Sequence, residues 1–183
     1  MAHLKIITVG CPSMLKSVMK WIAEGDKGLV YLRILRKASE AVYPDGMAFD
    51  YGKGYILRES ENDKAVIVTY GRGIYEAMVA ADLLKEKGIG LKVVDMPSVD
   101  EAMLIKLYKS GLPIILAEQN NGYLAAKMPK ILMRAGLTID PAQITTVNML
   151  GKDGQPQFVH SGTYGQLTKA FGLSGGQLAE LAE

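Results

Sequence analysis

The stretch AVIVTYGRGIYEAMVAADLLKEKGIGLKVVD, residues 65–95, decides the fold. Its first part, Ala65 to Tyr70, is a continuous apolar strand pattern, which is typical of a strand covered on both faces. Helical periodicity runs from Ile74 to Lys87 and ends at Gly88, and Leu91 to Asp95 predicts a further strand. Strands that alternate with helices of this length predict βαβ crossovers and a mainly parallel sheet.

The same alternation continues on both sides of this stretch. Further strands are predicted at 113–118 and 144–149, and helices at 98–109, 123–135 (interrupted at Pro129), 163–171 and 176–181. Ser98 with Glu101, and Ser174 with Gln177, have the spacing of capping boxes. Lys53 to Arg58 precedes a polar turn and is expected to form a hairpin with the strand at 65–70. Residues 47–183 therefore predict an α/β fold with a five-stranded mixed sheet and one antiparallel edge strand.

Residues 1–36 are too few to form a domain. Lys5 to Val9 and Leu29 to Leu35 predict strands, and Ser13 to Glu24 between them predicts a helix. Two strands alone bury little surface and leave both sheet edges exposed. We expect this segment to be the last βαβ unit of a larger sheet whose front is not in this chain. Lys37 to Gly46 carries turn residues without periodicity and is expected to be a linker.

Composition excludes several classes of protein. The chain has 183 residues, of which 49% are hydrophobic and 22% charged, so intrinsic disorder is excluded. The longest apolar run, Leu112 to Ala117, is too short to cross a membrane. With 21 basic and 19 acidic residues and no basic stripe, a nucleic-acid partner is not expected. Cys11 is the single cysteine, which favours a reducing compartment, and we predict a cytoplasmic location.

Two arginines and one glycine-rich turn are candidate anion-binding features. Arg33 and Arg36 lie at the end of the strand at 29–35, and arginine binds phosphate groups through two parallel hydrogen bonds. Alternation along the strand predicts that these two side chains face opposite ways. Tyr70 to Gly73 joins a strand to a helix N-terminus, where anions are favoured, although a tight turn explains these glycines as well.

Polar residues also end the other predicted strands. Glu118 to Gly122 could form a polar site, but helix capping by Asn120 or Asn121 is the simpler interpretation. Asp95 is expected to serve the turn before Pro97. Cys11 is expected to be a buried, inert thiol. From spacing alone, these residues do not form a catalytic constellation.

The order of the motifs resembles a known family. LVYLRILRKASEAVY (29–43), FDYGKGYILRE (49–59), the stretch from residue 65 to VVDMPSV (93–99), IILAEQNNGYLAAKM (114–128) and HSGTYGQLTKAFGLS (160–174) are similar to the C-terminal end of thiamine-diphosphate-dependent transketolases. The resemblance implies that residues 1–40 end a pyrimidine-binding domain. It also implies that residues 47–183 form a transketolase C-terminal domain, a three-layer αβα sandwich.

The resemblance also carries expectations about function. The complete enzyme would transfer two-carbon ketol units between sugar phosphates with thiamine diphosphate and Mg²⁺, as a homodimer. The glutamate that activates the cofactor and the metal site lie upstream in the family, so this chain alone is expected to bind no cofactor, to hold no catalytic residue, and to need the N-terminal and pyrimidine domains as partners. Arg36 matches the family's arginine for the substrate phosphate.

Two other interpretations of the sequence are possible. The chain could be a stand-alone, non-catalytic module that binds a partner or a regulator. It could also belong to the beta subunit of a 2-oxoacid dehydrogenase or to a deoxyxylulose-phosphate synthase.

Overall fold

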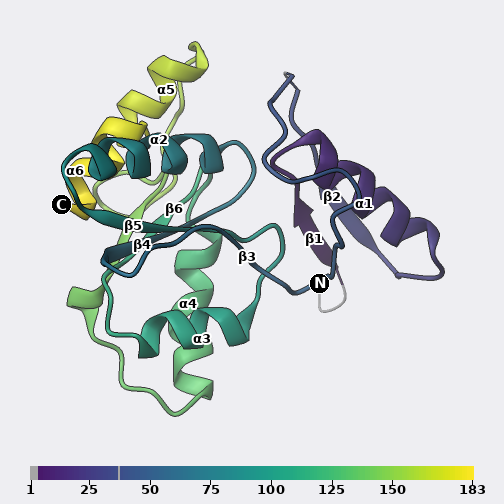
Figure 1. The fold of residues 1–183 in the computed structure, drawn as a ribbon, viewed down its shortest axis with the longest axis horizontal. Coiled ribbons are helices and arrows are strands. Elements are labelled where there is room, and N and C mark those ends of the chain that lie inside the picture. Colours follow the sequence, from purple (N-terminus) through teal and green to yellow (C-terminus); the bar gives the residue numbers. More distant parts are fainter. Residues whose placement is uncertain (1–3, 37) are drawn as a thin grey trace.

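The chain folds into a smaller and a larger part that lie side by side (Figure 1). A computed structural model describes residues 4–36 and 38–183. The smaller part comprises β1 (Lys5–Thr8), α1 (Pro12–Ala23) and β2 (Val30–Arg33), and its two strands pair in parallel. Lys37, where the predicted linker begins, lies outside the described residues, and the linker residues that follow it form no helix or strand up to β3.

The larger part is built on a five-stranded sheet in the order β3-β5-β4-β6-β7. Its strands are β3 (Tyr55–Arg58), β4 (Asp63–Thr69), β5 (Gly90–Asp95), β6 (Ile114–Ala117) and β7 (Ile144–Val147). Its helices are α2 (Gly73–Glu86), α3 (Glu101–Lys109), α4 (Tyr123–Arg134), η1 (Pro141–Gln143, a 3-10 helix), α5 (Tyr164–Ala170) and α6 (Gly175–Ala182). Only β3 runs antiparallel to its neighbour, which confirms the predicted mixed sheet with one antiparallel edge.

The predicted hairpin is wrong. β3 pairs with β5, and β5 separates it from β4. β4 is buried along Ala65 to Thr69, so it takes the centre of the sheet between two parallel neighbours, β5 and β6. β3 has no fully buried residue and therefore fits the edge.

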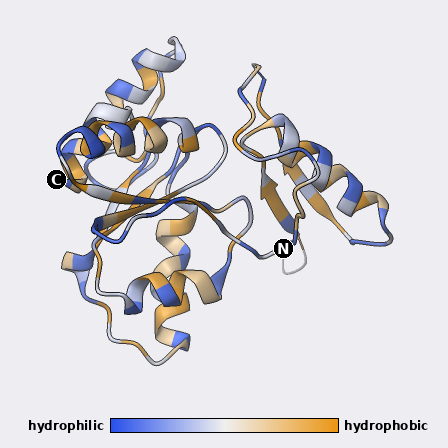
Figure 2. Cartoon of the chain, in the orientation of Figure 1, coloured by the Kyte–Doolittle hydropathy of each residue, from blue (hydrophilic) through white to orange (hydrophobic). Residues whose placement is uncertain are grey.

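Helices cover both faces of the larger sheet, so the larger part has three layers. Figure 1 shows α2 and α6 on one side of the sheet and α3 and α4 on the other. The alternation of β4 supplies both interfaces, because Ala65 and Ile67 pack toward α2 while Val66 and Val68 pack toward α3 and α4. Hydrophobic residues line the strands and the inner faces of these helices (Figure 2).

Local details of the helices differ from the sequence prediction. α4 continues through Pro129 without the predicted interruption. Asp100, and not Ser98, caps α3 by accepting a hydrogen bond from Met103 N at 2.9 Å. The hydroxyl of Ser174 donates to the side chain of Gln177 and does not cap the α6 backbone.

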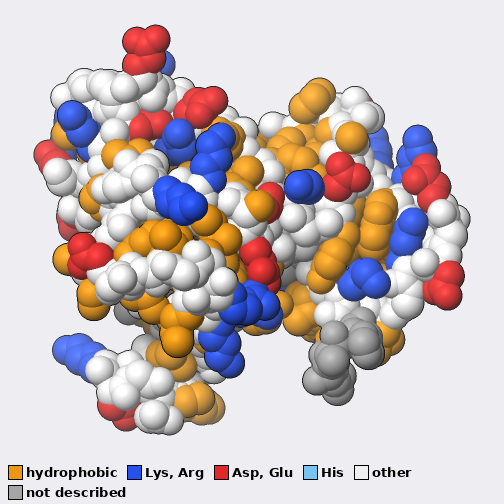
Figure 3. Space-filling view, turned by 90° about the horizontal axis from the view of Figure 1, so that it is seen from below, with side chains coloured by type: hydrophobic (Ala, Val, Ile, Leu, Met, Phe, Trp, Pro, Cys, Tyr) orange, Lys and Arg blue, Asp and Glu red, His pale blue; other side chains and the backbone are white. Residues whose placement is uncertain are grey.

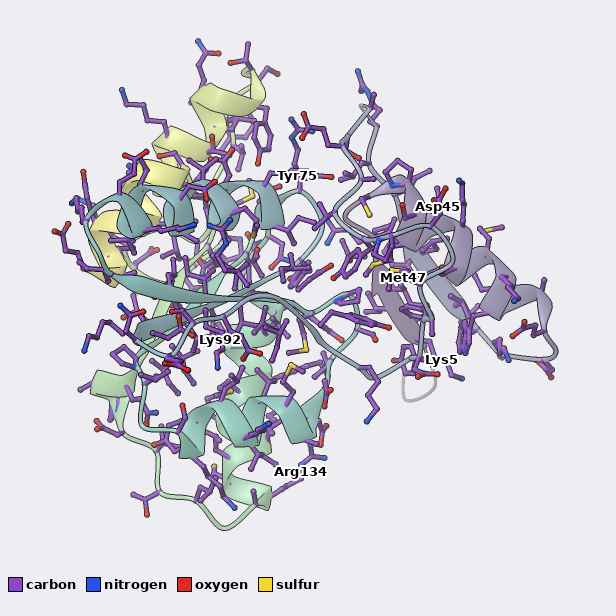
Figure 4. All side chains as sticks on the ribbon, in the orientation of Figure 1. Lys5, Asp45, Met47, Tyr75, Lys92 and Arg134 are labelled. Carbon is purple, nitrogen blue, oxygen red and sulfur yellow. The ribbon has the colours of Figure 1, made fainter. Side chains whose placement is uncertain are left out.

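A third apolar core belongs to the smaller part and is completed by the linker. Ile7, Val9, Met14 and Val18 are buried together with Phe49. The ring of Phe49 packs edge to face against Trp21, with 5.6 Å between the ring centroids. Figure 4 shows that Asp45 and Met47, in the irregular segment between β2 and β3, also lie over this part. Residues 4–36 therefore bury more than their own sequence predicts, because the chain after them returns to cover α1.

Candidate functional site

The carboxyl ends of the two sheets face each other, and we call this junction the seam. Thr8 N, at the end of β1, donates to Pro97 O, just beyond β5, at 2.8 Å. Gly71, just beyond β4, has φ +60° and approaches the methyl group of Thr8 so closely that a Cβ there would lie 2.9 Å from it. Ligand sites in α/β proteins occur outside the carboxyl ends of parallel strands. The seam is therefore the candidate functional site.

A buried polar network lies on the α3 and α4 side of the seam. Tyr70 donates its hydroxyl hydrogen to Glu118 Oε1 at 2.7 Å and accepts a hydrogen bond from the side-chain amide of Asn120. Glu118 is 1% exposed, and its two carboxylate oxygens also accept from Leu124 N at 2.6 Å and Ala125 N at 3.0 Å. Burial, and then the Glu118 charge, raise the pKa of Tyr70.

This network resolves the two interpretations of Glu118 to Gly122. The N-cap residue of α4 is Gly122, and not the predicted Asn120 or Asn121, but Asn120 Oδ1 still accepts a hydrogen bond from Tyr123 N, the first N–H group of the helix, at 3.1 Å. Glu118 also binds backbone N–H groups in the first turn of α4, where a carboxylate is favoured by the helix dipole. The sequence signal for this second role was a glutamate that directly follows a buried apolar strand.

The two candidate arginines lie in different surroundings. Arg33 is half-buried and lines a small cavity in the seam together with Thr8, Tyr70, Ser98 and Tyr123. Its charge lowers the pKa of Tyr70, against the larger effects of burial and Glu118. Arg36 is exposed, three residues further along. Among the described residues, neither guanidinium has an ion-pair partner within 4.0 Å.

A second buried pair lies on the α2 side of the seam. Asp95 is 0% exposed, and its Oδ2 accepts a hydrogen bond from the Tyr43 hydroxyl at 2.8 Å. Within the described part of the chain, Asp95 Oδ1 has no hydrogen-bond partner. Burial raises the pKa of Asp95 to about 7, although the Tyr43 hydrogen bond acts in the opposite direction. The expected turn role of Asp95 is thus wrong: it is a buried group that holds the linker.

The Tyr70 to Gly73 segment is a tight turn. The N–H groups of Gly73 and Ile74 donate to the carbonyl oxygens of Tyr70 and Gly71, so these donors are not available to an anion. Arg72 stacks on the ring of Tyr164, 4.4 Å from its centroid. The following helix contributes instead to the contact between the two parts, because the Tyr75 hydroxyl lies 2.9 Å from Gly10 O and 2.7 Å from Glu40 O (Figure 4).

The donor set does not fit a metal–diphosphate group. Residues 4–36 and 38–183 contain no cluster of three or more His, Cys, Asp or Glu side chains that could hold a metal ion. Cys11 is buried in the core of the smaller part, in agreement with the expected structural thiol. A search of the same residues for a helix long and apolar enough to cross a membrane finds none.

Comparisons with known proteins give a consistent picture. The family model described as "Transketolase, C-terminal domain" matches residues 52–177. A putative transketolase C-terminal section from Methanocaldococcus jannaschii is 30% identical over 169 residues, which cover 90% of this chain and 50% of that protein. Transketolase-like protein 1 from Bos taurus is 35% identical over 104 residues, or 55% of this chain and 17% of that protein. The chain thus spans half or less of these two relatives.

Solved structures support the fold. A structure described as a split gene transketolase, inactive beta4 tetramer, has a TM-score of 0.80 at 22% identity, covering 98% of this chain and 56% of that one. Transketolase from Campylobacter jejuni has a TM-score of 0.66 at 18% identity, covering 98% of this chain and 26% of that one.

Proposed function

The chain belongs to the transketolase C-terminal domain family, and we propose that it is the C-terminal section of a transketolase-type transferase that acts only together with the remaining domains. In this proposal the assembled protein transfers two-carbon ketol units between sugar phosphates. This chain covers only 50% of the transketolase C-terminal section from Methanocaldococcus jannaschii, which supports the proposal that it is one part of a larger enzyme.

The observation that carries this proposal is the incomplete sheet of the smaller part. Among the described residues, β1 and β2 pair only with each other. Leu29, Tyr31 and Ile34, on and beside β2, are exposed, with 54% of the Tyr31 surface accessible. A two-stranded sheet with exposed apolar side chains is marginal alone, and further strands would cover it. We propose that residues 1–40 complete a pyrimidine-binding domain supplied by the rest of the enzyme, and that residues 47–183 are the separate C-terminal domain.

The cofactor belongs to that remainder in our proposal. Thiamine diphosphate and Mg²⁺ would be held by the upstream domains, because the described residues of this chain offer no metal-ligand cluster. This chain would contribute Arg36, whose exposed position after β2 leaves it free to reach the phosphate of a substrate. A cytoplasmic homodimer is part of the same proposal.

Co-expression tests the proposal. The chain is expressed with and without the polypeptide that carries the remaining transketolase domains in its genome, and thiamine diphosphate binding is followed by calorimetry with Mg²⁺. We expect cofactor binding and ketol transfer only from the co-purified complex. Micromolar cofactor binding by the chain alone would contradict the proposal, and failure to co-purify would favour the stand-alone module.

A matched pair of variants tests the docking surface. Tyr31→Lys places a charge on the exposed face of β2 and is expected to prevent co-purification while the stability of the isolated chain changes little. Met133→Lys is the control, because Met133 is 68% exposed on α4, away from the smaller part. Loss of the complex with both variants would show that β2 has no special role.

A further inference from the structure

Arg33 is a half-buried cation in the seam without a direct anionic partner. It ends β2 and lies beside Thr8 in the β1–β2 register. No hydrogen bond or ion pair of its guanidinium with another described residue is found. A guanidinium carries five N–H donors, and those of Arg33, which water can reach, are available to a ligand.

The other polar side chains of the same cavity can also donate. The hydroxyls of Thr8 and Tyr123 take no hydrogen bond from or to any described group, and both line the cavity with Arg33. Ser98 Oγ accepts from Gly52 N at 2.8 Å, which leaves its own hydrogen free. Lys127 Nζ lies 5.0 Å from the centroid of the Tyr123 ring, which adds a second positive charge beside this lining residue.

The carboxylates near the seam are already engaged. Glu118 lies behind Tyr70 and accepts three hydrogen bonds. Asp95 is held by Tyr43 on the opposite face of the sheet. Asp100 caps α3 and accepts from Gly54 N at 3.1 Å. None of these three residues lines the cavity that Arg33 enters. The wall of this cavity therefore offers hydrogen-bond donors and positive charge without a competing acid.

We propose that the seam binds an oxyanion head group, of the phosphate class, on Arg33, Thr8, Ser98 and Tyr123. The cavity has a volume of about 20 Å³, which is room for one water-sized group, and it opens to solvent between the two parts of the chain. One oxygen atom of the head group would therefore enter it, while the rest of the ligand stayed at its mouth. Figure 3 shows the two parts meeting along this junction, with both basic and acidic side chains on the larger part beside it. Both a free inorganic anion and the phosphate of a sugar phosphate present this chemistry. The inference is independent of the proposed function.

Binding at this place would hold the two parts together. Arg33 and Thr8 belong to the smaller part, whereas Ser98 and Tyr123 belong to the larger part. A ligand that contacts both favours the docked arrangement over any arrangement in which the seam is open. Occupancy should therefore protect residues 38–46 from proteolysis as well as raise the melting temperature.

The experiment titrates the full chain with sodium phosphate, sodium sulfate and ribose 5-phosphate against sodium chloride at matched ionic strength. Calorimetry gives the affinity, and melting temperature and proteolysis at 38–46 report the docking. We expect saturable binding of phosphate by the natural chain. Arg33→Met should weaken it by about tenfold to a hundredfold, the loss typical of a charged hydrogen bond. Tyr123→Phe, which removes only a hydroxyl, should weaken it by a smaller factor.

The control variant is Arg134→Met, which removes an exposed arginine on α4 that is paired with Glu101 and does not line the cavity. It should bind phosphate as the natural chain does. Tighter binding of ribose 5-phosphate than of phosphate would identify a sugar phosphate as the ligand, and binding of the inorganic ions alone would identify a free anion. Equal, non-saturating stabilisation of all variants is a general salt effect and would overturn the proposal. So would an unchanged affinity in Arg33→Met, which would leave Arg33 as a distant counter-charge to Glu118.

Discussion

Replacement of Asp95 by asparagine should remove a loss of stability that the natural chain suffers as pH rises. Burial raises the pKa of this carboxyl from 3.8 to about 7, so the folded chain binds the proton more tightly than the unfolded chain does. The contribution of this protonated carboxyl to the free energy of unfolding is fully present below pH 4. It falls as pH rises toward 7 and has been lost above that pH. At about 1.4 kcal/mol for each tenfold change in proton affinity, the ionised carboxylate costs about 4 kcal/mol.

The measurable part of this cost lies between pH 5 and pH 8. Linkage gives a loss of about 2–3 kcal/mol over this interval for the natural chain from this one group. Asparagine keeps an oxygen that accepts the hydrogen bond from Tyr43, and it cannot ionise. The Asp95→Asn variant therefore loses none of this free energy as pH rises. Its amide nitrogen would replace Oδ1, which has no partner among the described residues, and this costs about 1–3 kcal/mol at every pH. That constant cost cancels when the pH profiles are compared.

Urea denaturation from pH 5 to pH 8 measures the effect. The free energy of unfolding of the variant should rise relative to the natural chain by about 2–3 kcal/mol across the interval. Tyr43→Phe removes the hydrogen bond that favours the charged carboxylate. The free energy of unfolding of this variant should therefore fall more steeply with rising pH than that of the natural chain. Asp82→Asn, at an exposed aspartate of α2, is the control. A difference between Asp95→Asn and the natural chain that does not change with pH would refute the reasoning.

Three further predictions concern other parts of the chain. In the complete enzyme, Arg36→Ala should raise KM for phosphorylated substrates by about tenfold to a hundredfold and leave non-phosphorylated substrates unaffected, with Arg134→Ala as the control in steady-state assays. Phe49→Ala should lower the free energy of unfolding by about 3–4 kcal/mol in urea, whereas Phe158→Ala, at an 80% exposed ring, should change it little. Limited proteolysis should cut within 38–46 before it cuts the larger part, and equal resistance throughout would show that the linker is held as firmly as the sheet.

The sheet was largely predictable because its signals are local. The apolar run of β4, the helical period of α2 and the second run of β5 each lie within one short window, and the crossover rule then makes their strands parallel. The partner of β3 was mispredicted because sequence proximity suggested a hairpin with β4, whereas β5 and β6 occupy both edges of β4 and β3 pairs with β5. Caps were mispredicted for a related reason, since Ser98 and Asp100 both suit the role and only tertiary contacts decide between them.

The seam could not be derived from spacing. Tyr43 and Asp95 are 52 residues apart, and their hydrogen bond depends on how the linker crosses the end of β5. Alternation along a strand separates Arg33 from Arg36, but only the docking of the larger part against β2 makes Arg33 half-buried and leaves Arg36 in solvent. Both arginines were candidates from the sequence, and only Arg33 lines the candidate site.

The return of the linker over α1 restricts where the gene could be divided. A breakpoint between β2 and β3 on the N-terminal side of Phe49 would place that ring on a different polypeptide from Trp21 and Val18, although all three belong to one apolar core. Each fragment would then expose part of that core to water until the two met again. A boundary drawn at residue 52, where the family model begins, falls after Phe49 but cuts the chain next to Tyr51, whose ring stacks on Trp21. Fusions and truncations of this protein should therefore keep residues 4–54 on one polypeptide.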